Sequence, residues 1–198
     1  MTGKVLKIGV AGTHSTGKST LLGALRIQLE AEGFRVALVK DLAVAARDAG
    51  FPILREQTED TALWIMAEGI RREAEAALLN DVILVDRAIF DALGYLEAAL
   101  DVTGRPRSNG RHAILEGLAR TYARDYDLLV ITELDSALPL GPARDDNAEF
   151  REAAGLRILR FAAGLDRDFI TMNSKNRDDV EREILTFIRS RVGPSAGV

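Results

Sequence analysis

The stretch from Gly12 to Ser19 has the residue types and spacing of a loop that wraps around phosphate groups. It reads GTHSTGKS, which fits the pattern G-x-x-x-x-G-K-[ST] at every fixed position, and Thr20 follows it. Glycines are needed where a side chain would collide with phosphate or where the backbone torsions are unusual, so that successive amide N–H groups can point inward. The sequence therefore predicts a site for the phosphates of a nucleotide.

The members of this loop have separate expected roles. Lys18 is expected to reach the β- and γ-phosphates, and the Ser19 hydroxyl is expected to ligate Mg²⁺. The helix that begins near Lys18 adds the partial positive charge of its N-terminus. The four residues between the glycines should act mainly through their amides, with the His14 side chain facing solvent. The expected nucleotide-binding residues are Gly12, Thr13, His14, Ser15, Thr16, Gly17, Lys18, Ser19 and Thr20.

A second candidate group lies in the stretch DVILVDRAIFD, residues 81–91. An apolar run that ends in Asp86 is typical of a strand whose terminal carboxylate faces a phosphate loop and orients Mg²⁺, usually through water. The alternative is an acid that caps the following turn. Arg87 is expected to contact a transferring phosphoryl group or the acid of the substrate site, with an ordinary position in an arginine-rich chain as the alternative.

Asp41 ends another predicted strand, in the stretch RVALVKD. If this strand lies close to the strand before the phosphate loop, the carboxylate faces an acceptor pocket and can accept a hydroxyl proton. A solvent-exposed helix N-cap explains Asp41 equally well. Asp86 is the other candidate for the base.

These residues must be positioned by apolar, β-branched runs that alternate with longer stretches of helical periodicity. Such alternation is typical of βαβ units around a parallel sheet, so the predicted fold class is α/β. The expected strands are 5–11, 36–40, 82–86, 128–132 and 169–172. The expected helices are 18–32, 43–49, 59–79, 90–100, 111–124, 148–165 and 177–192. A polar stretch rich in turn-forming residues is expected to be a surface loop at 103–111.

Length and composition limit the organisation of the chain and its partners. With 198 residues, 47% of them hydrophobic, the chain fits one domain at 1–192 and a flexible tail at 193–198. The absence of cysteine excludes disulfides, thiolate nucleophiles and cysteine metal sites. A net charge of −4 gives no general attraction to nucleic acid or to an anionic membrane. Without a secretory signal or a membrane-spanning apolar stretch, the expected location is cytoplasmic.

Other motifs separate the classes of protein that share a phosphate loop. A regulatory GTPase needs D-x-x-G at its metal-binding strand and N-K-x-D for guanine, but position 89 is Ile and residues 173–176 read NSKN. An oligomeric mechanical ATPase needs a second helical domain, for which the chain is too short. The class that remains is a small phosphotransferase that closes a lid over two substrates. The polar connection at 133–155 follows a predicted strand and is the expected lid, with an ordinary surface crossover as the alternative.

Three stretches together resemble the AAA-domain-containing P-loop nucleoside and nucleotide kinase-like proteins: GTHSTGKSTL, ILVDRAIFDALGYLEAAL and PLGPARDDNAEFREAAG. The chain is similar in outline to the ribosylnicotinamide kinase domain and, more distantly, to deoxynucleoside kinases, from about residue 5 to residue 190. The resemblance implies a three-layer P-loop NTPase fold, with helices on both faces of a five-stranded parallel sheet of order 2-3-1-4-5. Its narrower motifs are DR-x-x-x-D-x-x-x-Y (Asp86, Arg87, Asp91, Tyr95) and R-x-x-x-x-x-F-R (Arg144, Phe150, Arg151).

The resemblance also implies roles for individual residues. Arg144 and Arg151 match lid arginines that approach the phosphates on closure, where planar guanidinium groups suit the charge of a transferring phosphoryl group. Asp41 falls where deoxynucleoside kinases carry a glutamate base, and the shorter aspartate departs from that pattern. The helix around Trp64 shapes the acceptor pocket in such kinases, although its spacing also fits plain core packing. Adenine is expected against the loop at 173–177.

These observations predict a kinase that uses ATP and Mg²⁺ to phosphorylate a hydroxyl of a nucleoside-like small molecule. A nucleotide-dependent regulatory ATPase or binding module with slow hydrolysis is the alternative. Phosphate transfer onto nucleic-acid ends is supported only by a local basic cluster, Arg105, Arg107 and Arg111. Neither nucleic acid nor a membrane is an expected partner. The acceptor, the pathway, the choice between ATP and GTP and the oligomeric state, a homodimer included, stay open.

Overall fold

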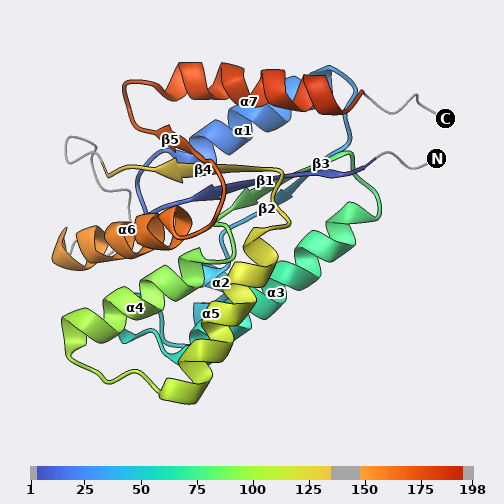
Figure 1. Ribbon diagram of the computed structural model, residues 1–198. Helices are drawn as coiled ribbons and strands as arrows, with labels where there is room; N and C mark the ends of the chain where they lie inside the picture. The colour runs from blue at the N-terminus through green and yellow to red at the C-terminus, as the bar shows by residue number, and fades with distance from the viewer. Residues whose placement is uncertain (1–3, 135–147, 194–198) are drawn as a thin grey trace.

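Five short apolar runs form the strands of one parallel sheet, which Figure 1 shows in a computed structural model that describes residues 4–134 and 148–193. The strand order is β2-β3-β1-β4-β5, so the order 2-3-1-4-5 is confirmed. Every pairing is parallel, which requires a crossover between successive strands. The strands are β1 (Leu6–Ala11), β2 (Val36–Val39), β3 (Val82–Asp86), β4 (Leu128–Thr132) and β5 (Ile170–Met172).

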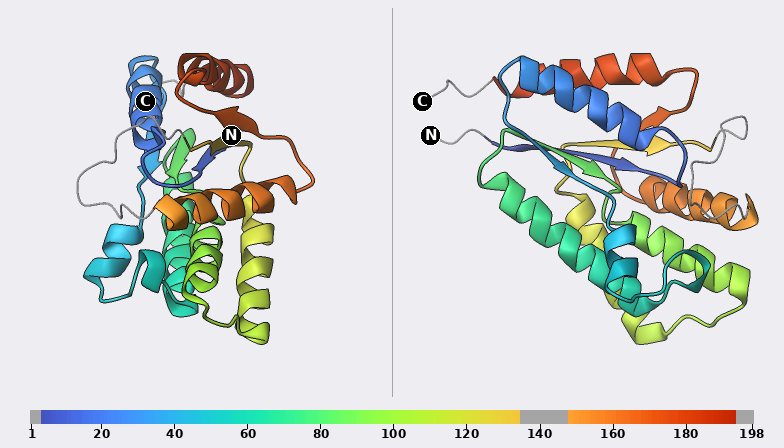
Figure 2. Two further views of the ribbon diagram at one scale, coloured as in Figure 1. Left: turned by 90° about the vertical axis from the view of Figure 1, so that its left-hand side faces the viewer. Right: turned by 180° about the vertical axis from the view of Figure 1, so that it is seen from behind.

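Helices cover both faces of this sheet, as predicted. Figures 1 and 2 show α1 and α7 on one face, and α3, α4, α5 and α6 on the other. The helices are α1 (Lys18–Ala31), α2 (Ala43–Asp48), α3 (Glu59–Ala77), α4 (Asp91–Thr103), α5 (Asn109–Ala123), α6 (Ala148–Ala163) and α7 (Arg177–Arg191), with a 3₁₀ turn η1 (Leu54–Glu56).

Two apolar cores flank the sheet because successive side chains of a strand point to opposite faces. Leu6, Ile8 and Val10 of β1 pack in the core beneath α1 and α7, together with Ile184 and Ile188 of α7. The last helix therefore packs an apolar face against the sheet. The second core joins α4 and α6 to the other face, so the sheet is buried on both sides.

The carboxyl ends of the strands bring the candidate site residues to one edge of the sheet, where ligands bind in open parallel sheets. Val10 pairs with Asp86 in the β1–β3 register, so the phosphate loop begins beside the end of β3. Val39 pairs with Val85 in the β2–β3 register, which brings Asp41 to the same edge.

The structure also differs from the predicted elements. The segment expected as a loop at 103–111 is shorter, because α4 continues to Thr103 and α5 begins at Asn109. The 3₁₀ turn η1 was not predicted, and its Leu54 has φ of 58°. Of the expected lid, residues 148–155 belong to α6 and residues 135–147 lie outside the described residues. Within the described part of the chain, no helix is long and apolar enough to span a membrane.

Candidate nucleotide-binding site

The loop between β1 and α1 has the backbone conformation that its glycines predict. Gly12 has φ of 129° and Gly17 has φ of 84°, which side chains of L-residues rarely allow. A Cβ atom on Gly12 would lie 2.1 Å from Thr132 Oγ1 and 2.8 Å from the Thr132 carbonyl oxygen. Gly12 is therefore required both by its torsion and by the close approach of β4.

Lys18 is folded onto this loop from the first turn of α1. Its ammonium group donates to the carbonyl oxygens of Gly12, at 2.8 Å, and of Thr13, and lies 3.2 Å from Thr16 Oγ1. The side chain is only 5% exposed. Burial and then the charge of Arg87 lower the pKa of Lys18 to about 7, although nearby carboxylates oppose this shift. A nucleotide phosphate near this lysine would favour its charged form.

Ser19 and Asp86, the two expected Mg²⁺ ligands, lie in direct contact. The Ser19 hydroxyl donates to Asp86 Oδ2 at 2.7 Å, which joins the start of α1 to the end of β3. A hydroxyl and a carboxylate are the protein groups through which P-loop proteins hold Mg²⁺ beside the nucleotide phosphates. The donor set therefore fits this ion. In the described residues, this site included, no group of three or more His, Cys, Asp or Glu side chains is arranged to hold a metal.

Arg87 connects the end of β3 to three neighbouring groups. Its Nε donates to Asp41 Oδ2 at 2.6 Å, its Nη1 lies 3.6 Å from Asp91 Oδ2, and its guanidinium lies 4.8 Å from the centre of the Tyr95 ring. The backbone of Arg87 has φ of 77°, a strained conformation that clusters at functional sites. Only 16% of the Arg87 side chain is exposed, and its contact with a transferring phosphoryl group stays a prediction.

Asp41 contacts the start of α2 and Arg87 at the same time, although the N-cap residue of α2 is Leu42. One carboxylate oxygen accepts the Ala43 amide at 2.9 Å beside α2, while the other accepts Arg87. Burial by itself would raise the pKa of Asp41, but the charge of Arg87 and the two hydrogen bonds outweigh it and lower the pKa. Asp41 is therefore held as a carboxylate, and its role as a base stays a prediction.

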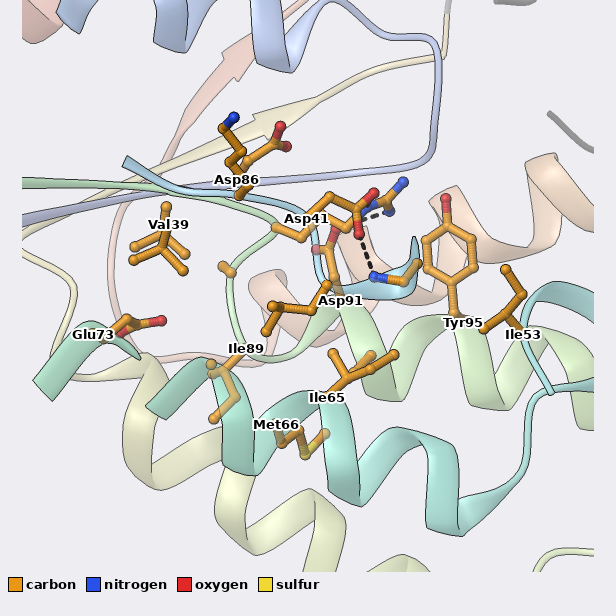
Figure 3. Close-up of a pocket in the computed structure, with 18 of the residues that line it drawn as sticks. Val39, Asp41, Ile53, Ile65, Met66, Glu73, Asp86, Ile89, Asp91 and Tyr95 are labelled. Carbon is orange, nitrogen blue, oxygen red and sulfur yellow. Dashed lines mark hydrogen bonds and ion pairs between the residues drawn. The ribbon is translucent and has the colours of Figure 1, made fainter. Parts of the chain in front are cut away.

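Two cavities meet at these residues. The larger, of about 510 Å³, is lined by the second half of the phosphate loop from Ser15 to Thr20 and by Asn173, Ser174 and Arg177 after β5. The smaller, of about 60 Å³, extends between β2, β3, α3 and α4. Figure 3 shows Asp41 and Asp86 on one side of the smaller cavity, with Ile65 and Met66 opposite. Asp41, Asp86 and Arg87 line both cavities.

Side chains of α4 and α6 contact the first half of the phosphate loop, residues 12–14. His14 is 3% exposed, so the expectation that its side chain faces solvent is wrong. Its Nδ1 lies 3.2 Å from the Tyr95 hydroxyl, a contact that a residue 81 positions away supplies. Gly12, Thr13 and His14 are not among the residues that line the larger cavity, and their direct contact with a nucleotide stays a prediction.

Arg151 also donates hydrogen bonds to the backbone of the phosphate loop. It is 8% exposed and belongs to α6, where its Nε donates to the His14 carbonyl at 3.2 Å and its Nη2 to the Ser15 carbonyl at 3.4 Å. The arginine expected from the lid thus contacts the loop in this state of the protein. Arg144, the second expected lid arginine, lies outside the described residues.

Two other groups that the sequence singled out lie away from the cavities. Trp64 is half-buried against Phe51, with ring centres 5.6 Å apart, and it is not a lining residue of the smaller cavity. Its neighbours Ile65 and Met66 line that cavity instead. The basic cluster at 105–111 is engaged locally: Arg105 donates to Thr103 and the Arg55 carbonyl, while Arg107 and Arg111 pair with Asp101 and Asp60.

Sequence reasoning missed what Asp91 and Thr132 do at the site. Both oxygens of Asp91 lie 3.2 Å from the Gly12 amide nitrogen, and the Thr132 hydroxyl lies 2.6 Å from that of Thr16. Burial raises the pKa of Asp91 to about 7, against the charges of Arg87 and Lys18. For Asp91, the signal in the sequence was its four-residue spacing from Tyr95, which places both side chains on one helix face.

A phosphate loop after β1, an acid at the end of the neighbouring β3 and the sheet order 2-3-1-4-5 define the P-loop NTPase class of fold. The family model described as AAA domain matches residues 7–181, and the chain belongs to that family. A search of curated proteins found none that matches the chain significantly. The family and the loop together indicate nucleotide binding.

Proposed function

We propose that the protein is a kinase that transfers the γ-phosphoryl group of ATP to a hydroxyl of a nucleoside-like small molecule, with Mg²⁺ as cofactor. One observation carries this proposal: the cavity at the phosphate loop and the apolar cavity beside α3 share Asp41, Asp86 and Arg87 as a wall. A donor and an acceptor bound in the two cavities would meet at charged groups suited to phosphoryl transfer.

The larger cavity suits the donor. Lys18 and the second half of the loop line it and would contact the phosphates, while Asn173, Ser174 and Arg177 line it from the segment expected to contact adenine. Ser19 and Asp86 would hold Mg²⁺, which supplies charge neutralisation at the phosphates when bound. The missing guanine motif favours ATP over GTP.

The smaller cavity suits the acceptor. Its lining is mainly apolar, with Ile53, Ile65 and Met66 among the residues that would contact a flat or apolar body. At about 60 Å³ it is far smaller than a nucleoside, so the acceptor's entry requires neighbouring side chains to move. The pair between Arg87 and Asp41 stands at the shared wall, where an incoming hydroxyl would displace it.

The chemistry at the shared wall follows from the groups present. The acceptor oxygen attacks the γ-phosphorus in line, its proton passes to the carboxylate of Asp41 or Asp86, and the bond to the β,γ-bridging oxygen breaks to leave ADP. Lys18 and Arg87 place positive charge where negative charge develops on the transferring group. Arg87 keeps Asp41 ionised, the form that a base needs, although the lowered pKa makes it a weak base while the pair with Arg87 is intact.

Transfer of γ-labelled ATP to a panel of nucleosides tests this function. We expect label in one nucleoside monophosphate, at a rate that depends on added Mg²⁺, and no transfer by Lys18→Ala. Label that appears only in inorganic phosphate with every acceptor would favour the regulatory ATPase instead. Full transfer by Lys18→Ala would contradict the role of the loop.

A further inference from the structure

Helix α4 holds the first half of the phosphate loop through two side chains that no part of the proposed reaction uses. Figure 3 shows Asp91 and Tyr95 rising from α4 toward the loop. Asp91 contacts the amide of Gly12, and Tyr95 contacts the amide of His14. We propose that Asp91 and Tyr95 are positioning residues that set the shape of the phosphate loop for ATP. The inference rests on the nucleotide-binding part of the proposed function and not on the acceptor.

Tyr95 holds the loop through its hydroxyl. The oxygen accepts the His14 amide at 2.9 Å and lies 3.4 Å from Thr13 Oγ1. The ring is fixed on two sides, because Phe150 packs edge-on against it at 5.8 Å and the Arg87 guanidinium lies 4.8 Å from its centre. Tyr95 is 6% exposed, so water does not readily replace its hydroxyl as an acceptor.

Asp91 holds the start of the loop. Its side chain is 2% exposed, and both of its oxygens lie 3.2 Å from the Gly12 amide nitrogen. The carbonyl of Gly12 accepts Lys18 at 2.8 Å, so both polar groups of this residue are engaged by protein. His14 is held in the same way, since Tyr95 accepts its amide and Arg151 donates to its carbonyl.

The loop is thereby divided into two parts with different tasks. Residues 12–14 are anchored to α4 and α6, while residues 15–20 line the cavity that would hold the nucleotide. Anchoring the first part fixes where the second part lies before ATP arrives, so less conformational freedom is lost on binding. Removing an anchor should therefore weaken ATP binding more than a loss of stability alone would.

The Tyr95→Phe variant tests the proposal, with Tyr126→Phe as a matched control. Tyr126 is also buried, and its hydroxyl accepts the amide of Ile89 at 2.9 Å and donates to Glu73 at 3.0 Å, but it lies outside both cavity linings. Each variant removes one hydroxyl that accepts a backbone amide. The measurement is the Kd for ATP with Mg²⁺ by isothermal titration calorimetry, without any acceptor, together with Tm.

We expect both variants to lower Tm, but only Tyr95→Phe to raise the Kd for ATP, by roughly 10-fold. A second pair of variants tests the proposal even if Tyr95→Phe folds poorly. Asp91→Asn retains an oxygen that can accept the Gly12 amide, whereas Asp91→Ala does not. Asp91→Asn should therefore bind ATP more tightly than Asp91→Ala.

Unchanged ATP affinity in Tyr95→Phe and Asp91→Ala would overturn the inference while leaving the proposed kinase intact. An equal loss of affinity in Tyr126→Phe would also overturn it, because a general loss of stability would then explain the effect. Wild-type protein that binds ATP but phosphorylates no acceptor would overturn the kinase and leave the positioning role standing. No ATP binding by the wild-type protein would overturn both.

Discussion

Replacing Lys18 by Met separates what this lysine does for nucleotide binding from what it costs the fold. The ammonium group is buried beneath the phosphate loop, and burial is the main reason that its pKa falls to about 7. Methionine has a similar length and no charge, so it can fill the same space. We expect Lys18→Met to lose ATP binding without losing stability.

The expected change in the free energy of unfolding follows from two opposing contributions. Lowering the pKa of a lysine from 10.5 to about 7 corresponds to a cost of about 4 kcal/mol for the folded protein at pH 7. The variant avoids this cost but loses the hydrogen bonds to Gly12, Thr13 and Thr16, worth about 1.5 kcal/mol each because the donor is charged. The two contributions nearly cancel, so the free energy of unfolding should stay within about 1 kcal/mol of the wild-type value.

Urea unfolding with and without Mg-ATP measures both effects. Ligand at 100 times its Kd should stabilise the wild-type protein by about 2.7 kcal/mol and leave Lys18→Met unchanged. The lowered pKa also gives the direction in which the stability difference changes with pH. Between pH 7 and 10.5 the unfolded chain binds more protons at this lysine than the folded chain, so wild-type stability rises with pH relative to the variant.

Two results would refute this reasoning. A variant several kcal/mol less stable than wild type at pH 7 would mean that Lys18 supports the fold and that its burial costs little. A variant still stabilised by ATP as strongly as the wild-type protein would mean that Lys18 does not contact the phosphates.

Three further predictions follow from the site and its surroundings. Gly12→Ala should lower the free energy of unfolding by about 3 kcal/mol, measured in urea, because its Cβ would collide with Thr132. Asp41→Asn should slow phosphoryl transfer by roughly 100-fold or more while the Kd for ATP stays unchanged. In α3, hydrogen bonds from Arg71 and then Arg72 lower the pKa of Glu68 to about 2. The stability advantage of wild type over Glu68→Gln should therefore be full above pH 4.5 and disappear as the pH falls toward 2, measured by urea unfolding.

Each of these has its own control. Gly117 lies in α5, where an added Cβ atom would meet no neighbouring side chain or strand within 4 Å, so Gly117→Ala should not destabilise the protein. An Asp41→Asn variant that transfers label at the wild-type rate would assign the base to Asp86 or to no side chain. Glu116→Gln, which removes an exposed acid that pairs with Arg120 among the described residues, is the control, and an equal change with pH in both variants would contradict the role given to Glu68.

Local pattern predicted most of the fold because the strands are short, continuous apolar runs. The predicted strand at 82–86 coincides with β3, and the one at 128–132 coincides with β4. Both strands are buried and end at the loops that carry the site, where a polar residue follows the apolar run. The order of the strands came from the resemblance, since alternation alone does not determine it.

The sequence did not predict contacts that join distant parts of the chain. His14 has small polar residues on either side, which suggests exposure, yet Tyr95 from α4 covers it. Arg151 matches a lid motif by spacing, but α6 packs so that its guanidinium meets the loop carbonyls. Such contacts depend on how α4 and α6 pack against each other, which no window of neighbouring residues encodes.

Asp41 shows why a residue's role is harder to predict than its position. The sequence placed it at the end of a strand and offered either a base or a helix cap. In the structure one oxygen caps the backbone at Ala43 and the other binds Arg87. A carboxylate has enough acceptor sites for both contacts, so the hydrogen bond to Ala43 does not exclude a role as base, and that role stays a prediction.

The most direct test of phosphoryl transfer is a single-turnover reaction with γ-labelled ATP, Mg²⁺, excess enzyme and a saturating nucleoside from the panel. The measured quantity is the partition of label between the acceptor and inorganic phosphate. A shared wall between the two cavities predicts that most of the label is in the acceptor, and that Asp41→Asn slows its appearance. Label found entirely in inorganic phosphate, at the same rate with and without each nucleoside, would contradict the proposed kinase.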